Sequence, residues 1–471
     1  MMFSSPLFLF AFLPLFLLCY RATPHRWANV TALVASLVFY AWGEPVFVLF
    51  ALSSALLDLG TVALLITTSH PGARRFLLIV GVTANLGLLA YFKYANFAVS
   101  NFQSLAKAWI GVDMPVTSSI ALPIGVSFIV FEKITYIVDV YRGAGPPART
   151  IHDYLLYVFL FPKLLAGPIL KYRDLASQIV ERSARVEDVA QGLTRFSFGL
   201  AKKMLLADPM GELADASFAS GDDSIGFCVA WLGAIAFGLQ IFFDFSGYSD
   251  MAIGLARMIG FRLLENFNYP YLAIGFGDFW RRWHISLSTW IRDYLYIPLG
   301  GDRVSKPRLY LNLWLCFLAS GLWHGAAWTF VLWGAYHGLF LTLDRMFMKR
   351  WLNRLPRSVG IVYTFLAVTV GWVLFRAPDL RSALAYLGAM AQPWQASQRF
   401  IIITSDIYLA MAIGLTICFL PGHSRIDRLY RDVATRRTWT TWSTVAASVL
   451  LLFSIGKATT VAFHPFLYFR F

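Results

Sequence analysis

The chain has 471 residues, of which 58% are hydrophobic, 17% are aromatic and only 14% are charged. A soluble globular domain carries about 25% charged residues, so this composition excludes a soluble protein and indicates several membrane spans. The formal net charge of +14 does not indicate nucleic-acid binding, because the basic residues stand in short loops between apolar segments.

Four apolar segments open the chain. The loops Arg21–Arg26 and His70–Arg75 are basic, whereas the turn Gly43–Pro45 is not. Basic loops stay in the cytoplasm, so we expect the N-terminus outside the inner membrane. No basic residue precedes the first apolar run, which therefore reads as a span rather than a cleaved signal peptide. The predicted spans are Ser4–Tyr20, Trp27–Trp42, Val46–Thr67 and Phe76–Tyr91.

The middle of the chain, from Pro123 to Gly338, does not alternate between spans and basic loops. Its apolar runs are short and are broken by glycine, proline and charge, for example at Glu132-Lys133, Asp139 and Lys163. Irregular backbone and ionisable side chains persist at membrane depth only inside protein or beside water, and they are usually functional. We therefore expect the chemistry here. No internal repeat is present, which argues against a secondary transporter.

A cluster of polar residues interrupts the apolar stretch that begins near Gln240. Gln240 and Asp244 stand one helical turn apart on one face. Side chains such as these need hydrogen-bond partners in a membrane. We predict a supporting polar network, either a scaffold or a set of groups that orients a catalytic histidine. Its members are Gln240, Asp244, Ser246, Tyr248 and Asp250.

The segment Phe279–Pro298 places tryptophan at helical spacing with arginine beside it. Such an amphipathic helix prefers the membrane interface, and simple anchoring is one reading. The other is donor binding, because guanidinium groups bind phosphate bidentately. The candidate donor-binding residues are Trp280, Arg281, Arg282 and Trp283.

His324 lies in the segment Ser320–Trp328, between two tryptophans and beside glycine. Imidazole suits general-base catalysis on a hydroxyl group, although a satisfied core histidine is the alternative. His337 lies 13 residues on, roughly 140° around a continuous helix, so we expect it to face elsewhere and to be structural. No metal-ligand spacing occurs, and we predict no metal site and no bound cofactor.

The C-terminal third alternates again. The predicted spans Val359–Phe375, Phe400–Leu420 and Thr440–Ile455 are separated by basic clusters, which places the C-terminus outside with the N-terminus. The chain ends in Phe466–Phe471. That tail carries one hydroxyl, Tyr468, and is either an aromatic interface anchor or a functional group at the outer surface.

Six motifs in order resemble the membrane-bound O-acyltransferase family, and in particular its bacterial branch that modifies exported glycopolymers such as alginate. The resemblance implies an all-α polytopic fold, a ring of roughly 11 transmembrane helices with short, broken and re-entrant helices in the middle. It implies one domain over residues 1–471, with N-terminal helices (1–119), a catalytic core (120–345) and C-terminal helices with the tail (346–471). The motifs are Leu122–Phe128, Tyr136–Gly143, Phe161–Pro168, Asp244–Asp250, Trp280–His284 and Gly321–Gly325.

The resemblance also implies roles for single residues. The family's catalytic membrane histidine maps onto His324, and its second polar position falls nearest His284. The aromatic tail resembles one in which a tyrosine is proposed to accept the acyl group, so Tyr468 becomes a candidate acyl relay. Acetyl-CoA is then the expected co-substrate, and a periplasmic serine-esterase-like acetyltransferase the expected partner.

We therefore predict an inner-membrane O-acetyltransferase that delivers acetyl groups to an exported polysaccharide. Two alternatives stay open: a transporter or exporter subunit that makes no bond, and a lipid-directed acyltransferase of the same family. Direct contacts with membrane lipid are expected in each case. The sequence does not identify the polysaccharide.

Overall fold

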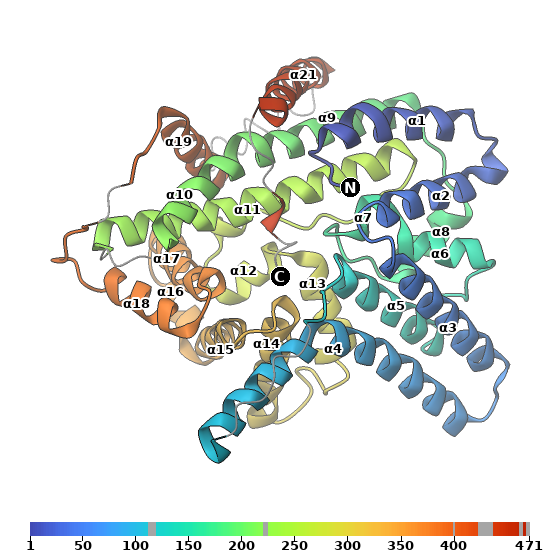
Figure 1. Cartoon of the computed structure of the whole chain (residues 1–471), viewed down its shortest axis with the longest axis horizontal. Coiled ribbons are helices and arrows are strands. Elements are labelled where there is room, and N and C mark those ends of the chain that lie inside the picture. Colours follow the sequence, from blue (N-terminus) through green and yellow to red (C-terminus); the bar gives the residue numbers. More distant parts are fainter. Residues whose placement is uncertain (112–118, 220–224, 399–400, 423–436, 461–464, 468–471) are drawn as a thin grey trace. The chain divides into compact units, whose positions relative to one another are not determined.

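The computed structural model is helical throughout the part that it describes, with no strand there. It describes all residues except 112–118, 220–224, 399–400, 423–436, 461–464 and 468–471. The chain divides into two compact units, whose helices are labelled in Figure 1. The first comprises Met1–Val189 with Leu255–Leu263, and the second comprises Ala190–Gly254 with Leu264–Phe471. The division at residues 119 and 345 that the sequence suggests stays a prediction.

The first unit is built from the N-terminal helices. They are η1 (Phe8–Phe12), α1 (Leu13–Ala22), η2 (His25–Trp27), α2 (Ala28–Ala41), α3 (Phe47–Thr67), α4 (Pro71–Ile110), α5 (Val126–Tyr141), α6 (Ile151–Phe159), α7 (Phe161–Leu164), α8 (Tyr172–Val180) and the beginning of α9 (Val186–Ala201).

Helix α4 is much longer than the predicted span that ends at Tyr91. It continues for 40 residues to Ile110, where Gly111 takes a positive φ of 71° and ends it. At 1.5 Å per residue this length is about twice the hydrocarbon thickness of a bilayer. The second half contains four Ala and no Gly or Pro, so no strong helix breaker ends it before Gly111.

Buried charges in the first unit pair with one another. Lys133, fully buried, lies 3.3 Å from Asp58, whose carboxylate also accepts hydrogen bonds from Asn85 at 2.8 Å and Tyr154 at 2.9 Å. Lys163 pairs with Glu132. These charges are therefore neutralised within the scaffold. Glu132, Lys133 and Lys163 belong to the block from Pro123 to Gly338, and the placement of the chemistry in that block stays a prediction.

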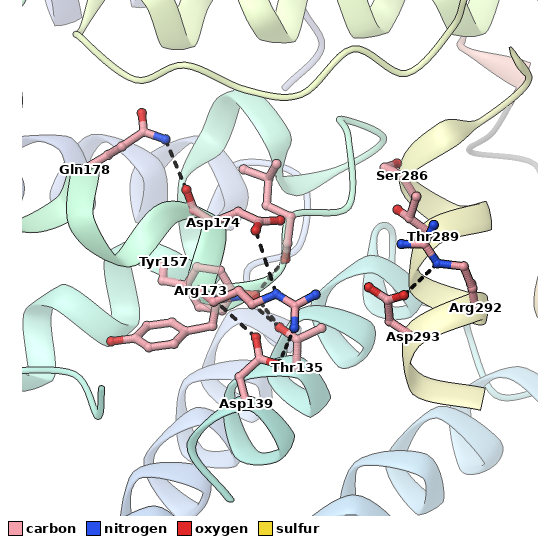
Figure 2. A network of polar contacts seen from close by, with 12 residues as sticks. Thr135, Asp139, Tyr157, Arg173, Asp174, Gln178, Ser286, Thr289, Arg292 and Asp293 are labelled. Atoms are coloured by element: carbon pink, nitrogen blue, oxygen red, sulfur yellow. Dashed lines mark hydrogen bonds and ion pairs between the residues drawn. The ribbon is translucent and has the colours of Figure 1, made fainter. Parts of the chain in front are cut away.

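A second polar group in this unit joins α5, α6 and α8. The hydroxyls of Thr135 and Tyr157 lie 2.7 Å apart, and Tyr157 donates to the carbonyl of Leu170 at 2.8 Å. Asp139 lies 3.9 Å from Arg173, as Figure 2 shows. Each bond satisfies a polar group that burial would otherwise penalise.

The second unit contains the long apolar helix α11 and the motif-bearing helices. Its elements after α9 are η3 (Lys202–Ala207), α10 (Asp208–Phe218), α11 (Phe227–Met258), η4 (Pro270–Leu272), α12 (Phe276–Arg282), α13 (Ile285–Ile291), η5 (Arg292–Tyr296), α14 (Lys306–His324), α15 (Trp328–Leu343), η6 (Asp344–Met348), α16 (Lys349–Leu352), α17 (Arg357–Arg376), α18 (Leu380–Met390), α19 (Ser405–Phe419), η7 (Leu420–Gly422) and α21 (Arg437–Thr460).

The predicted interfacial helix over Phe279–Pro298 is wrong. The chain breaks between α12 and α13, where His284 has a positive φ of 44°, and its tryptophans are buried. Trp283 is 1% exposed and packs on Trp372 with ring centres 4.9 Å apart. The apolar stripe therefore faces the protein core, and simple anchoring at the interface is excluded for these side chains.

Five helices of the described part are long and apolar enough to cross a membrane, and two shorter apolar helices accompany them. The five spans are Phe47–Thr67, Pro71–Ile110, Phe227–Met258, Arg357–Arg376 and Thr441–Thr460, and the shorter pair is Phe8–Ala22 and Ser405–Phe419. The protein is thus a multi-pass membrane protein, whereas a ring of roughly 11 transmembrane helices stays a prediction.

Candidate functional site

Helices α14 and α15 lie side by side (Figure 1), and His324 is the last residue of α14. Helix α14 ends at His324, and the following Gly325 is extended. Glycines let the two helices touch backbone to backbone: a Cβ on Gly321 would stand 2.3 Å from the Phe330 carbonyl, and one on Gly334 would stand 2.4 Å from the Phe317 carbonyl. Small residues allow this close packing between helices in membranes. Gly321, three residues before His324, thus serves helix packing.

The imidazole of His324 lies among aromatic rings. Its ring centre is 5.0 Å from that of Trp323, 5.0 Å from that of Trp333 and 5.2 Å from that of Phe375. The residue is 3% exposed. A histidine held in this way has a fixed ring orientation and is shielded from bulk water, both of which suit proton transfer to a bound substrate.

His284 occupies the break between α12 and α13 and is completely buried. Its Nδ1 lies 3.2 Å from the Oδ1 atom of Asn266, which also accepts hydrogen bonds from the backbone and hydroxyl of Ser286. The amide of Asn266 donates to Ser249, so its oxygen is the acceptor toward His284. Nδ1 then carries the proton, and Nε2 is the basic nitrogen.

One indole lies between the two predicted catalytic histidines. The ring of Trp323 is 6.1 Å from that of His284 and 5.0 Å from that of His324. The structure therefore brings together two residues that are 40 positions apart in the sequence. Asn266, which orients His284, escaped sequence analysis, because nothing in its neighbourhood distinguishes it from an ordinary loop asparagine.

The predicted orientation of His337 is wrong. It assumed one continuous helix, whereas the chain breaks between α14 and α15 and folds back on itself. His324 and His337 consequently contact the same indole, that of Trp333, at 5.0 and 4.6 Å. Nδ1 of His337 accepts a hydrogen bond from Trp280 at 3.1 Å. In the described residues no group of three His, Cys, Asp or Glu side chains is arranged to hold a metal.

A cavity of about 790 Å³ opens beside this aromatic cluster. Trp280, Phe317 and Leu313 form part of an apolar wall. Two carboxylates, Asp278 and Asp344, line the cavity, and basic side chains outnumber them, namely Arg281, Lys306, Arg345, Lys349 and Arg350. Apolar walls with basic groups suit a ligand that has a small apolar end and a phosphorylated end.

Only two of the four predicted donor-binding residues line that cavity. Trp280 and Arg281 do, whereas Arg282 and Trp283 do not. The Arg281 side chain is 64% exposed and lies 3.3 Å from Asp278. Arg282 is held by Asp278 at 3.1 Å and by the Asn268 carbonyl at 3.3 Å, which is a structural arrangement.

Arg345 is tied at the cavity by an ion pair. It donates to Asp302 at 2.6 Å, and this hydrogen bond holds the pKa of the Asp302 carboxyl below its ordinary value. In the same unit Arg292 donates to Asp293 at 2.8 Å (Figure 2). Arg345 is therefore partly neutralised, as Arg281 is by Asp278, and Lys306, Lys349 and Arg350 carry more of the cavity's net charge.

An aromatic layer separates the cavity from His324. The ring of Trp280, which lines the cavity, is 5.8 Å from that of Trp333, and the ring of Trp333 is 5.0 Å from that of His324. Two aromatic rings, those of Trp280 and Trp333, thus lie between the cavity and the imidazole.

The predicted polar network does not form one cluster. Asp250 pairs with Arg195 at 2.9 Å and Lys202 at 2.6 Å. Asp244 pairs with Lys203 at 2.9 Å, and Lys203 also contacts Asp208. These contacts join α9, η3 and α10 to α11, which is the scaffold alternative. Three further members lie along α11: Gln240 half-buried, and Ser246 and Tyr248 buried.

The beginning of the C-terminal tail docks on this helix. The backbone N–H of Leu467 donates to Asp244 at 2.6 Å. Phe466 is 1% exposed; its ring lies 4.9 Å from that of Tyr248, with the Lys203 ammonium 4.8 Å from its centre. The sequence suggested an aromatic interface anchor as one role of the tail. Phe466 does not have that role, because its ring is buried against the protein. Tyr468 lies outside the described residues.

Comparison with known proteins places these features in one class, that of membrane O-acyltransferases. The model of the membrane-bound O-acyltransferase family matches residues 150–381. Those residues include α10 to α17, and with them the candidate catalytic residues His284 and His324. The chain belongs to this family, and it is an O-acyltransferase.

Relatives with assigned names cover most or all of the chain. It is 48% identical to the probable alginate O-acetylase AlgI of Azotobacter vinelandii, over 83% of this chain and 78% of that protein. It is 42% identical to the probable alginate O-acetylase AlgI of Pseudomonas putida over the full length of both. The peptidoglycan O-acetyltransferase of Helicobacter pylori is 36% identical over 83% of this chain and 80% of that protein.

Proposed function

We propose that this protein takes acetyl from acetyl-CoA on the cytoplasmic side of the inner membrane and passes it outward for O-acetylation of an exported polysaccharide. The observation that carries the proposal is the cavity with an apolar wall and basic side chains, which only the rings of Trp280 and Trp333 separate from His324. Alginate is the favoured polymer, because two of the relatives bear that name at 42% and 48% identity.

His324 acts as the general base. It removes the proton of an attacking hydroxyl while that oxygen bonds to the acetyl carbonyl carbon. The carbon–sulfur bond of the thioester then breaks, and the coenzyme A thiolate leaves and takes up the proton. His284, oriented through Asn266, is the second candidate for holding a proton near this centre.

Tyr468 is the proposed first acceptor. A covalent tyrosyl ester would bridge the membrane, because acetyl-CoA is heavily charged and cannot cross hydrocarbon, whereas an acetyl group is small. Phe466 and Leu467, the two residues directly before Tyr468, dock against α11. This docking supports the assignment, because it fixes the chain next to the proposed acceptor. A phenol also surrenders acetyl more readily than an alkyl alcohol does.

Both termini lie on the periplasmic side in this proposal, as the basic loops indicate. We further propose a periplasmic serine-esterase-like acetyltransferase as partner, which takes the acetyl group to the polysaccharide. Normal polymer acetylation by this protein alone in a reconstituted membrane would overturn that part.

The direct test uses the purified full-length protein with acetyl-CoA in detergent or vesicles. We expect release of free coenzyme A and, after digestion, an acetyl mass on the C-terminal peptide. If the wild type released no more coenzyme A than the His324→Ala variant, acetyl-CoA would be excluded as the donor. Release with unmodified Tyr468 would retain the donor and remove the relay.

A further inference from the structure

A second cavity, of about 430 Å³, lies in the first unit. It is bounded by the loop after α1, the beginning of α2 and the end of α8. Four of its lining residues are basic: Arg21, His25, Arg26 and Arg182. None of the lining residues, all of which belong to the described part of the chain, is acidic. This cavity is distinct from the one that adjoins Trp280.

The polar atoms around Arg182 form a built site rather than a loose surface group. Its guanidinium donates to the Tyr20 hydroxyl at 3.1 Å, to Asn29 Oδ1 at 2.5 Å and to the carbonyl of Ile259 at 3.3 Å. It also lies 4.0 Å from the ring centre of Phe261. All these partners are neutral, so they orient the charge and do not cancel it.

The cavity contains three guanidinium groups, those of Arg21, Arg26 and Arg182. Among the described residues no carboxylate comes within ion-pair distance of Arg21, Arg26 or Arg182. By contrast, Arg195 in the second unit has both Asp250 and Glu265. Like charges that share a cavity repel one another, and a bound anion removes that repulsion. Phosphate is the anion that clustered arginines bind best.

Exposed apolar side chains beside the cavity indicate where the phosphate comes from. On α1, Leu15 and Leu18 are 64% and 70% exposed just before Arg21, and Trp27 follows it at 53%. Val180, at the end of α8, is 41% exposed. Apolar helix surface, then arginine, then tryptophan is the order found where a helix meets the membrane interface.

We propose that this cavity binds the phosphodiester head group of an anionic phospholipid, whose acyl chain lies along α1. A soluble phosphate would use the basic groups but not the exposed apolar surface. Basic pockets between membrane helices are known sites for such head groups. The site serves lipid binding and does not depend on the acyl-transfer proposal.

The test measures thermal unfolding of the full-length, delipidated protein in uncharged detergent. Three probes are titrated: phosphatidylglycerol, phosphatidylcholine with the same acyl chains, and inorganic phosphate. The variant R21Q/R26Q removes two exposed charges and spares Arg182, which holds the local structure. The matched control R74Q/R75Q removes two arginines from the beginning of α4, which is predicted to lie on the same side.

We expect phosphatidylglycerol to raise the unfolding midpoint of the wild type more than the other probes do. One basic side chain near a membrane strengthens attraction to anionic lipid by about fivefold, so R21Q/R26Q should weaken the apparent affinity by about 25-fold. R74Q/R75Q should retain it. Equal weakening in both variants would overturn the site in favour of general charge. An equal shift with inorganic phosphate would overturn the lipid as its source.

Discussion

The two units bury ionisable side chains in different surroundings. In the first unit, Lys133 and Lys163 are fully buried, and each has a carboxylate partner. In the second, His324 and His284 are as deeply buried, and aromatic rings pack against both, while the Asn266 amide and the Ser286 hydroxyl contact His284. A neutral histidine tolerates such surroundings, whereas a lone lysine would not.

This difference is a better criterion than burial for choosing candidate catalytic groups. A pair such as Glu132–Lys163 is satisfied internally, and it has no proton left to exchange with a substrate without breaking the pair. An imidazole among rings can change its protonation while the rings stay in place. The expectation that membrane-depth charges are functional therefore holds poorly in the first unit.

The largest expected effect is that of His324→Ala. General acid–base catalysis contributes about 10²–10⁴-fold, so polymer acetylation should fall by that factor while the amount of protein in the membrane stays normal. The control is His152→Ala, which removes a half-exposed histidine of the first unit. Retention of more than a tenth of the activity would remove His324 from the mechanism.

The variant Lys163→Met tests whether the buried Glu132–Lys163 ion pair is structural. Removing one partner of a buried pair leaves an uncompensated charge and should lower the free energy of unfolding by about 3–5 kcal/mol. Thermal unfolding in detergent measures this change. The double variant Glu132→Leu/Lys163→Met should recover most of it. A stable single variant with tenfold lower turnover would instead assign Lys163 to the chemistry.

Sequence analysis predicted much of the fold where apolar runs are continuous. The predicted Val46–Thr67 and Val359–Phe375 correspond to α3 and α17. Sequence analysis failed where a helix ends for reasons that the order of apolar and polar residues does not show. The break at His284 and the reversal after His324 depend on tertiary packing, in the second case on glycine contacts between α14 and α15.

The candidate site shows the same limit. Motifs singled out His324 and His284, but no spacing rule indicates that Trp323 lies between their rings or that Asn266 orients one of them. Likewise, Arg281 and Arg282 are indistinguishable in the sequence, although only the first lines the cavity. Such pairings arise from long-range packing, which a single sequence does not record.

A smaller effect is expected at the tail. Tyr468→Phe keeps the ring and removes only the hydroxyl, so folding should be unchanged while polymer acetylation falls by at least about tenfold. The docked residues Phe466 and Leu467 should hold the tail in both forms. Full activity would leave the tail as a docking segment. The measurement is polymer acetylation, with acetyl-CoA binding as the control.

The smallest effect is expected at the basic lining of the large cavity, where two adjacent arginines provide a matched pair. Arg281 lines the cavity and is 64% exposed, so Arg281→Gln should raise KM for acetyl-CoA by about threefold to tenfold, because exposure weakens a charge–phosphate contact. Arg281→Lys should restore part of this affinity, since an ammonium lacks the planar fork of guanidinium. Arg282 bonds to Asp278 and to the Asn268 carbonyl outside the cavity, so Arg282→Gln should lower the unfolding temperature and leave KM unchanged. Steady-state kinetics of coenzyme A release measure both. An equal rise of KM in the two variants would place the donor elsewhere, because only one of these side chains reaches the cavity.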